Sequence, residues 1–208
     1  MPPRVPKVVR KETLTSVIAS VTEKHNRKAP FSIVEVGVDR AGRSSDLTKE
    51  AIRNRCRRIH YYAFDLFQDW SVEKATAEYC RLSAPFSMDQ FQQLIGSITG
   101  VEYVRLIRGD VQKTIDESLA LPKLDVIWMS GGHSKETVLA CAGLFSNLSA
   151  HGVAIFDNYY PDLYDRGVLT VLPELVLLYP DFIFETPNRF DTLPSGDRVG
   201  PLKVHRRR

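Results

Sequence analysis

The sequence of 208 residues predicts an α/β protein with a doubly wound, mostly parallel sheet and an antiparallel pair of strands at the C-terminal end. Three observations carry this prediction. Short β-branched segments alternate with helical ones, which is typical of parallel βαβ units. Polar or glycine residues follow each of five segments. The length suits a single domain, so residues 1–208 are taken as one unit.

Five short segments rich in β-branched and aromatic residues predict the parallel strands, at 31–38, 59–67, 101–107, 124–129 and 152–157. Apolar residues at helical spacing predict helices at 12–25, 45–57, 112–120, 134–149 and 168–179. We expect Ser44 or Ser45 to be the N-cap of the second helix. Residues 1–30 form an N-terminal arm and helix. Residues 68–100, with helical patches at 72–81 and 88–98, form a helical insertion and a candidate cover for the site. Segments 182–187 and 197–206 predict the closing strands.

Composition excludes several classes of protein. No apolar run approaches the roughly 20 residues that a membrane helix needs, and the N-terminal segment lacks the apolar core of a secretory signal. The three cysteines, Cys56, Cys80 and Cys141, are widely spaced and form no CxxC pair. We expect reduced, buried thiols in a cytoplasmic protein.

The net charge of +3 is unevenly distributed along the sequence. Eight basic residues lie near the ends: Arg4, Lys7, Arg10, Lys11, Lys203, Arg206, Arg207 and Arg208. The rest of the chain has 20 basic residues against 25 acidic ones, and the terminal excess is expected on tails. One internal cluster comprises Arg53, Arg55, Arg57 and Arg58. It is interpreted first as a solvated helix end and second as a phosphate contact. Nucleic acid is therefore not the expected partner.

Ligands of an open parallel sheet bind beyond the carboxyl ends of its strands, where this sequence places a set of polar residues and glycines. They are Glu35, Gly37, Asp65, Asp110, Ser130, His133, Asp157 and Asn158. The segment Gly37–Gly42 lacks the middle glycine of a dinucleotide fingerprint, which disfavours an NAD-linked oxidoreductase. Asp65 suits the two hydroxyls of a ribose but is equally a solvated strand-end residue. Asp110 is either a ligand residue or a helix cap.

Five motifs carry a family resemblance across residues 31–160. They are E-V-G-V-x-R-x-G-x-S, F-D-L-F, R-L-I-R-G-D-V-x-x-T, W-M-S-G-G-H-S and G-V-A-I-F-D-N-Y. In this order they resemble class I S-adenosylmethionine-dependent methyltransferases, nearest to the branch of macrocin-type and catechol-type O-methyltransferases. The resemblance implies a Rossmann-like methyltransferase fold and S-adenosylmethionine as the cofactor. The cofactor residues that it implies are Glu35, Gly37, Ser44, Asp65, Leu66, Asp110, Val111 and Ser130.

Within that set, the resemblance places Glu35 and Gly37 beside the methionine part, Asp65 at the ribose, and Asp110 and Val111 at the adenine. Metal-dependent enzymes that the chain resembles carry D-G-x-H after the fourth strand, and the Asp binds Mg²⁺.

In this sequence Ser130 takes the place of that acid, and a hydroxyl contributes no charge to a metal site. Asp157 and Asn158 remain as oxygen ligands, so the sequence predicts at most a weak Mg²⁺ site. His133, with an ordinary pKa of roughly 6.5, is a candidate general base for a hydroxyl acceptor. Its alternative role is to cap the following helix or to bond a backbone carbonyl.

The leading hypothesis is methyl transfer from S-adenosylmethionine to a hydroxyl of a small molecule, with His133 as the base. A second is a catalytically degenerate module that binds the cofactor or a partner, which Ser130 suggests. A third is a nucleic-acid methyltransferase that grips phosphates through basic tails. The sequence leaves a homodimer open.

Overall fold

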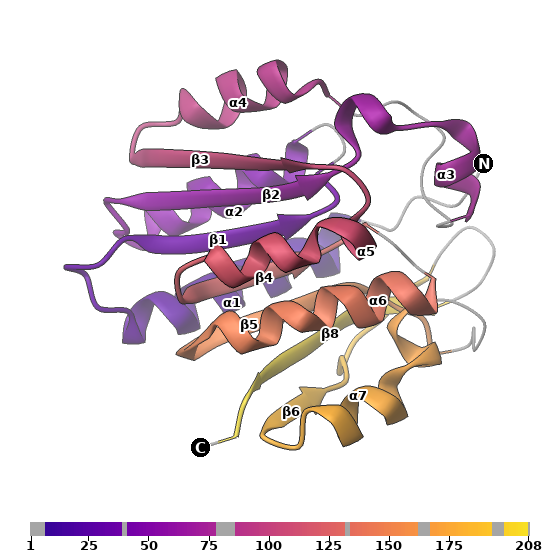
Figure 1. Ribbon diagram of the computed structural model, residues 1–208. Helices are drawn as coiled ribbons and strands as arrows, with labels where there is room; N and C mark the ends of the chain where they lie inside the picture. The colour runs from indigo at the N-terminus through magenta and orange to yellow at the C-terminus, as the bar shows by residue number, and fades with distance from the viewer. Residues whose placement is uncertain are drawn as a thin grey trace.

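A computed structural model describes residues 7–38, 41–77, 86–131, 134–161, 167–192 and 198–207. Its strands are β1 (Phe31–Val36), β2 (Ile59–Asp65), β3 (Val101–Arg108), β4 (Leu124–Met129), β5 (Leu148–Tyr159), β6 (Phe182–Glu185), β7 (Asp191–Thr192) and β8 (Arg198–Arg206). They form one eight-stranded sheet in the order β3-β2-β1-β4-β5-β8-β6, and β7 pairs with β8 (Figure 1). β1 to β5 pair in parallel, whereas β8 is antiparallel to both β5 and β6. The predicted fold class is confirmed.

The helices lie on both faces of this sheet. They are α1 (Lys7–Lys24), α2 (Gly42–Arg53), α3 (Val72–Ala77), α4 (Met88–Gly96), α5 (Val111–Thr114), α6 (Lys135–Ala142) and α7 (Leu172–Leu178). Short 3₁₀ turns are η1 (Phe67–Asp69), η2 (Ile115–Ala120), η3 (Gly143–Asn147) and η4 (Val168–Thr170). Apolar residues of α1, α2 and α4 pack on one face, and those of α5, α6 and α7 on the other. This is the doubly wound arrangement (Figure 1).

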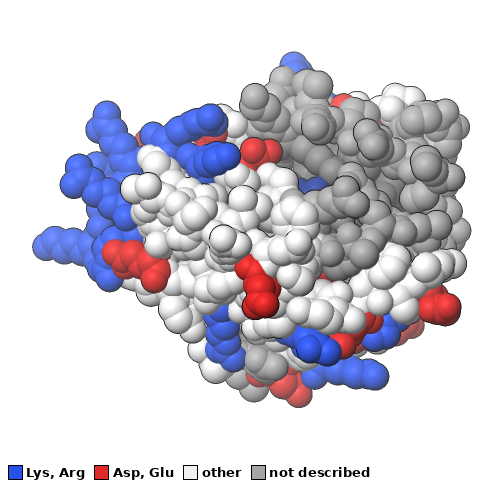
Figure 2. All heavy atoms as spheres, turned by 90° about the horizontal axis from the view of Figure 1, so that it is seen from above, with Lys and Arg blue, Asp and Glu red and all other residues white. Residues whose placement is uncertain are grey.

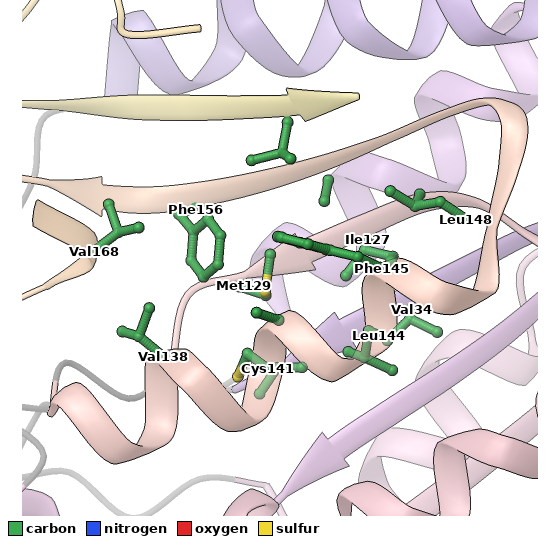
Figure 3. Packing of buried hydrophobic residues seen from close by; sticks show 14 of the residues in the cluster. Val34, Ile127, Met129, Val138, Cys141, Leu144, Phe145, Leu148, Phe156 and Val168 are labelled. Atoms are coloured by element: carbon green, nitrogen blue, oxygen red, sulfur yellow. The ribbon is translucent and has the colours of Figure 1, made fainter. Parts of the chain in front are cut away.

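Alternation along each strand divides the core into two halves. In β1, Ile33 packs with the α1–α2 half and Val34 with the α6 half, and both are fully buried. In the α6 half, the Phe145 ring contacts that of Phe156, with centroids 6.1 Å apart (Figure 3). The Phe145 ring also contacts that of Phe182, with centroids 5.4 Å apart. These apolar layers fix the strand register, and with it the positions of the strand ends.

α2 differs from the prediction at its start. It begins at Gly42, after Ala41 in a left-handed conformation with φ of 54°, and no side chain caps it. The expectation that Ser44 or Ser45 is the N-cap is wrong. Ser44 lies inside the first turn, where its hydroxyl donates a hydrogen bond to the buried carboxylate of Glu35.

Two other expected helices are divided. The segment 112–120 is a single α-turn, α5, followed by η2. The segment 168–179 is η4 followed by α7, because Pro173 lies in the first turn of α7 and cannot continue a preceding helix.

The segment between β2 and β3 holds two helices in different places. α4 begins with a capping box between Ser87 and Gln90, and it buries Phe91 and Ile95 against the sheet. It is therefore the crossover helix between two neighbouring strands. α3 lies instead near the edge where β1 to β4 end (Figure 1).

The expectation that the terminal basic residues lie on tails is wrong in part. Lys7, Arg10 and Lys11 lie in α1 rather than on a tail. In β8, Lys203 pairs with Glu185 at 2.8 Å, and the Arg206 guanidinium lies 4.9 Å from the centroid of the Phe182 ring.

Cys56 and Cys141 are free and buried as predicted, and Cys80 lies outside the described residues. Within the described ranges, no helix combines the length and the apolar character needed to cross a membrane.

Candidate active site

A buried acid ends β1. Glu35 is fully buried on the α2 side of the sheet, opposite Ala63 of β2 and Trp128 of β4 in register. The hydroxyls of Ser44 and Tyr61 both donate to its Oε2 atom, the latter at 2.6 Å. The first turn of α2 and the middle of β2 are thus tied to the same carboxylate.

Burial raises the pKa of Glu35 from 4.5 to about 7, although the Arg43 guanidinium and the two hydroxyl hydrogen bonds oppose the rise. The Oε1 atom accepts no hydrogen bond from the described residues and lies 3.8 Å from Nη1 of Arg43. A buried polar atom without a hydrogen bond is costly, so this oxygen is a candidate acceptor for a ligand.

Arg43 connects this acid to the end of β5. Its Nη2 atom lies 2.9 Å from Oδ2 of Asp157, which is 3% exposed. The indole of Trp128 donates to the same oxygen at 3.3 Å, and the Arg43 guanidinium lies 5.7 Å from the centroid of that indole ring. Asp157 therefore has a cationic partner within the protein.

This pairing bears on the predicted Mg²⁺ ligands. Asp157 already balances the charge of Arg43, and the side chain of Asn158 lies outside the described residues. Among the residues that the structure describes, no three His, Cys, Asp or Glu side chains come together as a metal site would require.

Asp65 joins the loop after β1 to the end of β2. Its Oδ2 accepts the Val38 N–H at 2.7 Å, and its Oδ1 accepts the Phe67 N–H at 2.9 Å. These two hydrogen bonds orient the carboxylate at the end of β2, beside the loop that follows β1. Leu66, next in the chain, is half-buried and immediately precedes η1.

The loops after β1 and β4 touch through two glycines. Gly37 has a φ of +80°, and a Cβ atom on it would lie 2.4 Å from the Cα of Gly131. Ser130 strengthens this contact, because its hydroxyl donates to the Gly37 carbonyl at 2.7 Å. Only glycine permits this approach, so Gly37 and Ser130 shape the rim of the sheet.

Asp110 caps α5, since its Oδ1 accepts the Gln112 N–H at 3.0 Å. The capping alternative is therefore confirmed, and a contact with adenine stays a prediction. The preceding Gly109 N–H donates to the Asp65 carbonyl at 2.9 Å, so Asp110 follows β3 beside Asp65. Val111 is buried in the core. His133 lies outside the described residues.

The structure thus brings the predicted residues of β1, β2, β4 and β5 to one edge of the sheet, but sequence reasoning missed Arg43, Tyr61 and Trp128. One signal was available for Arg43. A cation in the first turn of a helix opposes the helix dipole and calls for an acidic partner. Tyr61 and Trp128 carry no such signal, because large aromatics in strands are ordinary core residues.

The strand order, the antiparallel β8 between β5 and β6, and the acids at the ends of β1 and β2 define a Rossmann-like methyltransferase class. A family model described as a methyltransferase domain matches residues 34–159, more than half of the chain. The chain belongs to this methyltransferase-domain family.

Solved structures show the same fold. The O-methyltransferase NovP has a TM-score of 0.66 and 19% identity, covering 97% of this chain and 81% of its own. MycE, a methyltransferase of the mycinamycin biosynthetic pathway solved with Mg and SAH, has a TM-score of 0.56 and 12% identity, covering 99% of this chain and 56% of its own. An rRNA methylase from Streptococcus thermophilus has a TM-score of 0.52 and 12% identity, covering 99% of this chain and 98% of its own. Among curated proteins, no sequence matches.

Proposed function

We propose that the protein transfers a methyl group from S-adenosylmethionine to a hydroxyl of a small molecule. The observation that carries the proposal is the Asp65 carboxylate, which two backbone N–H groups orient at the end of β2, next to the loop after β1. The family assignment supports the proposal, and so does MycE, a fold neighbour solved with SAH.

The chain offers a donor set that fits this cofactor. Asp65 takes the ribose hydroxyls, and Asp110 and Val111 follow the neighbouring strand on the adenine side. Glu35 Oε1, buried without a hydrogen bond from the described residues, fits a cationic amino group. The surrounding backbone is held by Gly37, Ser44, Leu66 and Ser130. The Ser44 hydroxyl bonds Glu35, and the Ser130 hydroxyl bonds the Gly37 carbonyl.

The cofactor supplies an electrophilic methyl group on a sulfonium. The protein must orient the acceptor and remove the proton of its hydroxyl. His133 is assigned the role of base, because it follows Ser130 and Gly131 in the sequence shortly after the end of β4. An imidazole with an ordinary pKa of roughly 6.5 accepts a proton at neutral pH.

Mg²⁺ does not fit the described residues as a further participant. A divalent cation beside Asp157 would be repelled by the Arg43 guanidinium, whose Nη2 lies 2.9 Å from Asp157 Oδ2, and Ser130 supplies no charge. Asp157 is assigned to holding Arg43 and, through it, the first turn of α2.

The nucleic-acid alternative has the fold of the rRNA methylase in its favour. That alternative relied on basic tails to bind phosphates, but Lys203 and Arg206 lie in β8 and not on a tail, and Lys203 is paired with Glu185. Filter binding of an RNA oligonucleotide at modest salt tests it, with wild type and the Arg206→Ala/Arg207→Ala variant compared.

Calorimetry with S-adenosylhomocysteine, followed by turnover on a panel of phenolic and sugar hydroxyls, tests the proposal. We expect micromolar binding, and turnover on at least one acceptor class. His133→Ala should retain binding while turnover falls by about 10²–10⁴-fold. Binding without turnover on any acceptor would favour the degenerate module, and absence of binding would reject both.

A further inference from the structure

A second groove lies at the opposite edge of the sheet, where the strands begin. It has a volume of about 730 Å³ and is lined by residues around the starts of β1, β2 and β3, among them Phe31, Arg58 and Gly100. Ligand sites for small molecules commonly measure roughly 300–1,000 Å³. The methyl-transfer residues lie at the carboxyl ends of the same strands, so this groove is separate from them.

Arginines dominate its rim. Arg27 follows α1, and Arg55, Arg57 and Arg58 lie in the turn between α2 and β2. Figure 2 shows basic side chains gathered at the same end of the molecule. Arg58 pairs with Glu102 at 2.9 Å. Arg27, Arg55 and Arg57 make no ion pair or side-chain hydrogen bond with the described residues.

The backbone of the turn is fixed in an uncommon conformation. Arg55 has a φ of 69°, which non-glycine residues seldom adopt, and its N–H donates to the Ile52 carbonyl at 2.9 Å. The next N–H, that of Cys56, donates to the Ala51 carbonyl at 3.0 Å. Two hydrogen bonds thus hold the arginine turn against the end of α2.

Apolar side chains form the floor of the groove: Ile52 and Cys56 line it, above the fully buried Phe31. Two of the acids near the groove are engaged, since Asp125 contacts His25 at 3.2 Å and Glu102 holds Arg58. A third, Glu23, lines the adjoining hollow together with Arg27 and Arg55, which leaves the groove with more arginines than acids.

We propose that this groove binds a small molecule that carries a phosphate or pyrophosphate group. Guanidinium forks match phosphate oxygens in geometry and charge, and the apolar floor suits a ring or hydrocarbon attached to the phosphate. A concave site of this volume encloses one small ligand, whereas a nucleic-acid backbone requires a longer basic track. The proposal stands independently of the function proposed for the other edge.

Calorimetry on the full chain tests the site with inorganic pyrophosphate, AMP, ATP and adenosine, at low salt and with S-adenosylhomocysteine saturating. The variant is Arg27→Ala/Arg57→Ala. Its control, Lys49→Ala/Arg207→Ala, removes the same charge from exposed positions away from the groove. We expect wild type and control to bind pyrophosphate with equal affinity, and the variant to bind at least about tenfold more weakly.

The nucleotide arms identify the source of the phosphate. ATP or AMP binding more tightly than pyrophosphate points to a nucleotide, and pyrophosphate alone points to a free anion; adenosine should not bind. The proposal is overturned if pyrophosphate does not bind or if variant and control weaken equally. It is also overturned if a 20-nucleotide RNA binds far more tightly than ATP, because that result would indicate a nucleic-acid surface.

Discussion

The Nη2 atom of Arg43 lies 2.9 Å from Oδ2 of Asp157, and this contact joins the first turn of α2 to the end of β5. In the sheet, β4 separates β5 from β1, the strand before α2, and Trp128 of β4 donates to the same carboxylate. The helix dipole disfavours a cation such as Arg43 in the first turn of α2, and the carboxylate of Asp157 offsets this effect. The pair also gives Asp157 a structural role at the position where the sequence suggested a metal ligand.

Replacing Arg43 with Met should destabilise the protein by about 3 kcal/mol, because the buried Asp157 would lose its partner. Urea denaturation measures the free energy of unfolding. Arg53→Met is the matched control in the same helix. The Arg53 side chain, which pairs with Glu50, is 69% exposed, so we expect the free energy of unfolding to change by less than about 1 kcal/mol. Equal losses in both variants would contradict a special role for Arg43.

The free energy of unfolding should fall as pH rises from about 4.5 to 7. Burial raises the pKa of Glu35 from 4.5 to about 7, so in this window the folded chain keeps a proton that the unfolded chain releases. The loss is on the order of 3 kcal/mol and levels off above pH 7. Glu35→Gln should flatten the curve between pH 5 and 8. Glu185→Gln should leave the decline in place, because Lys203 lowers the pKa of Glu185 instead.

Gly37→Ala should destabilise the protein by at least about 2 kcal/mol and abolish binding of S-adenosylhomocysteine. The added Cβ would lie 2.4 Å from the backbone of Gly131, at a φ of +80° that alanine rarely adopts. Gly42→Ala is the comparison, because nothing lies within 4 Å of its Cβ position. That variant should be neutral, or more stable by up to about 1 kcal/mol. Normal binding by Gly37→Ala would show that the loop contact is dispensable.

Asp65→Asn should weaken S-adenosylhomocysteine binding by about tenfold or more. An amide has one acceptor oxygen, so it cannot accept both the Val38 and the Phe67 N–H and also bind two hydroxyls. Asp69→Asn, in the adjacent η1 turn, removes only an exposed pair with Arg108 and should bind normally. Calorimetry distinguishes the two, and unchanged affinity in Asp65→Asn would remove Asp65 from the proposed site.

Excess EDTA should leave methyl transfer unchanged, and millimolar Mg²⁺ should not raise the melting temperature. The physical reason is the charge of Arg43 at Asp157, which opposes a second cation. Activity that disappears with EDTA and returns with Mg²⁺ would show that Asp157 and Asn158 bind metal as the sequence suggested.

The strand pattern could be predicted from the sequence because burial on both faces leaves nearly continuous apolar runs, as in β1 and β4, where every residue is buried. The helix boundaries were less predictable. Ser44 has the residue type of an N-cap, but its bond to Glu35 depends on the packing of α2 against β1, which no local pattern encodes.

The rim of the site was predictable for a topological reason, since parallel strands deliver their last residues to one edge. The contacts that those residues make within the protein could not be predicted. Arg43, which pairs with Asp157, lies far from it in the chain, and so does Tyr61 from Glu35, to which it donates. Tertiary contacts of this kind decide whether an acid binds a metal, a ligand or the protein itself.

The placement of β8 between β5 and β6 has a consequence for biosynthesis. β6 emerges from the ribosome before β8, yet β8 is its only neighbour among the described strands of the sheet. Folding of this half must therefore wait for residues 198–206, and until then two open strand edges are exposed to other chains. A ribosome stalled before that segment should display a nascent chain prone to aggregation.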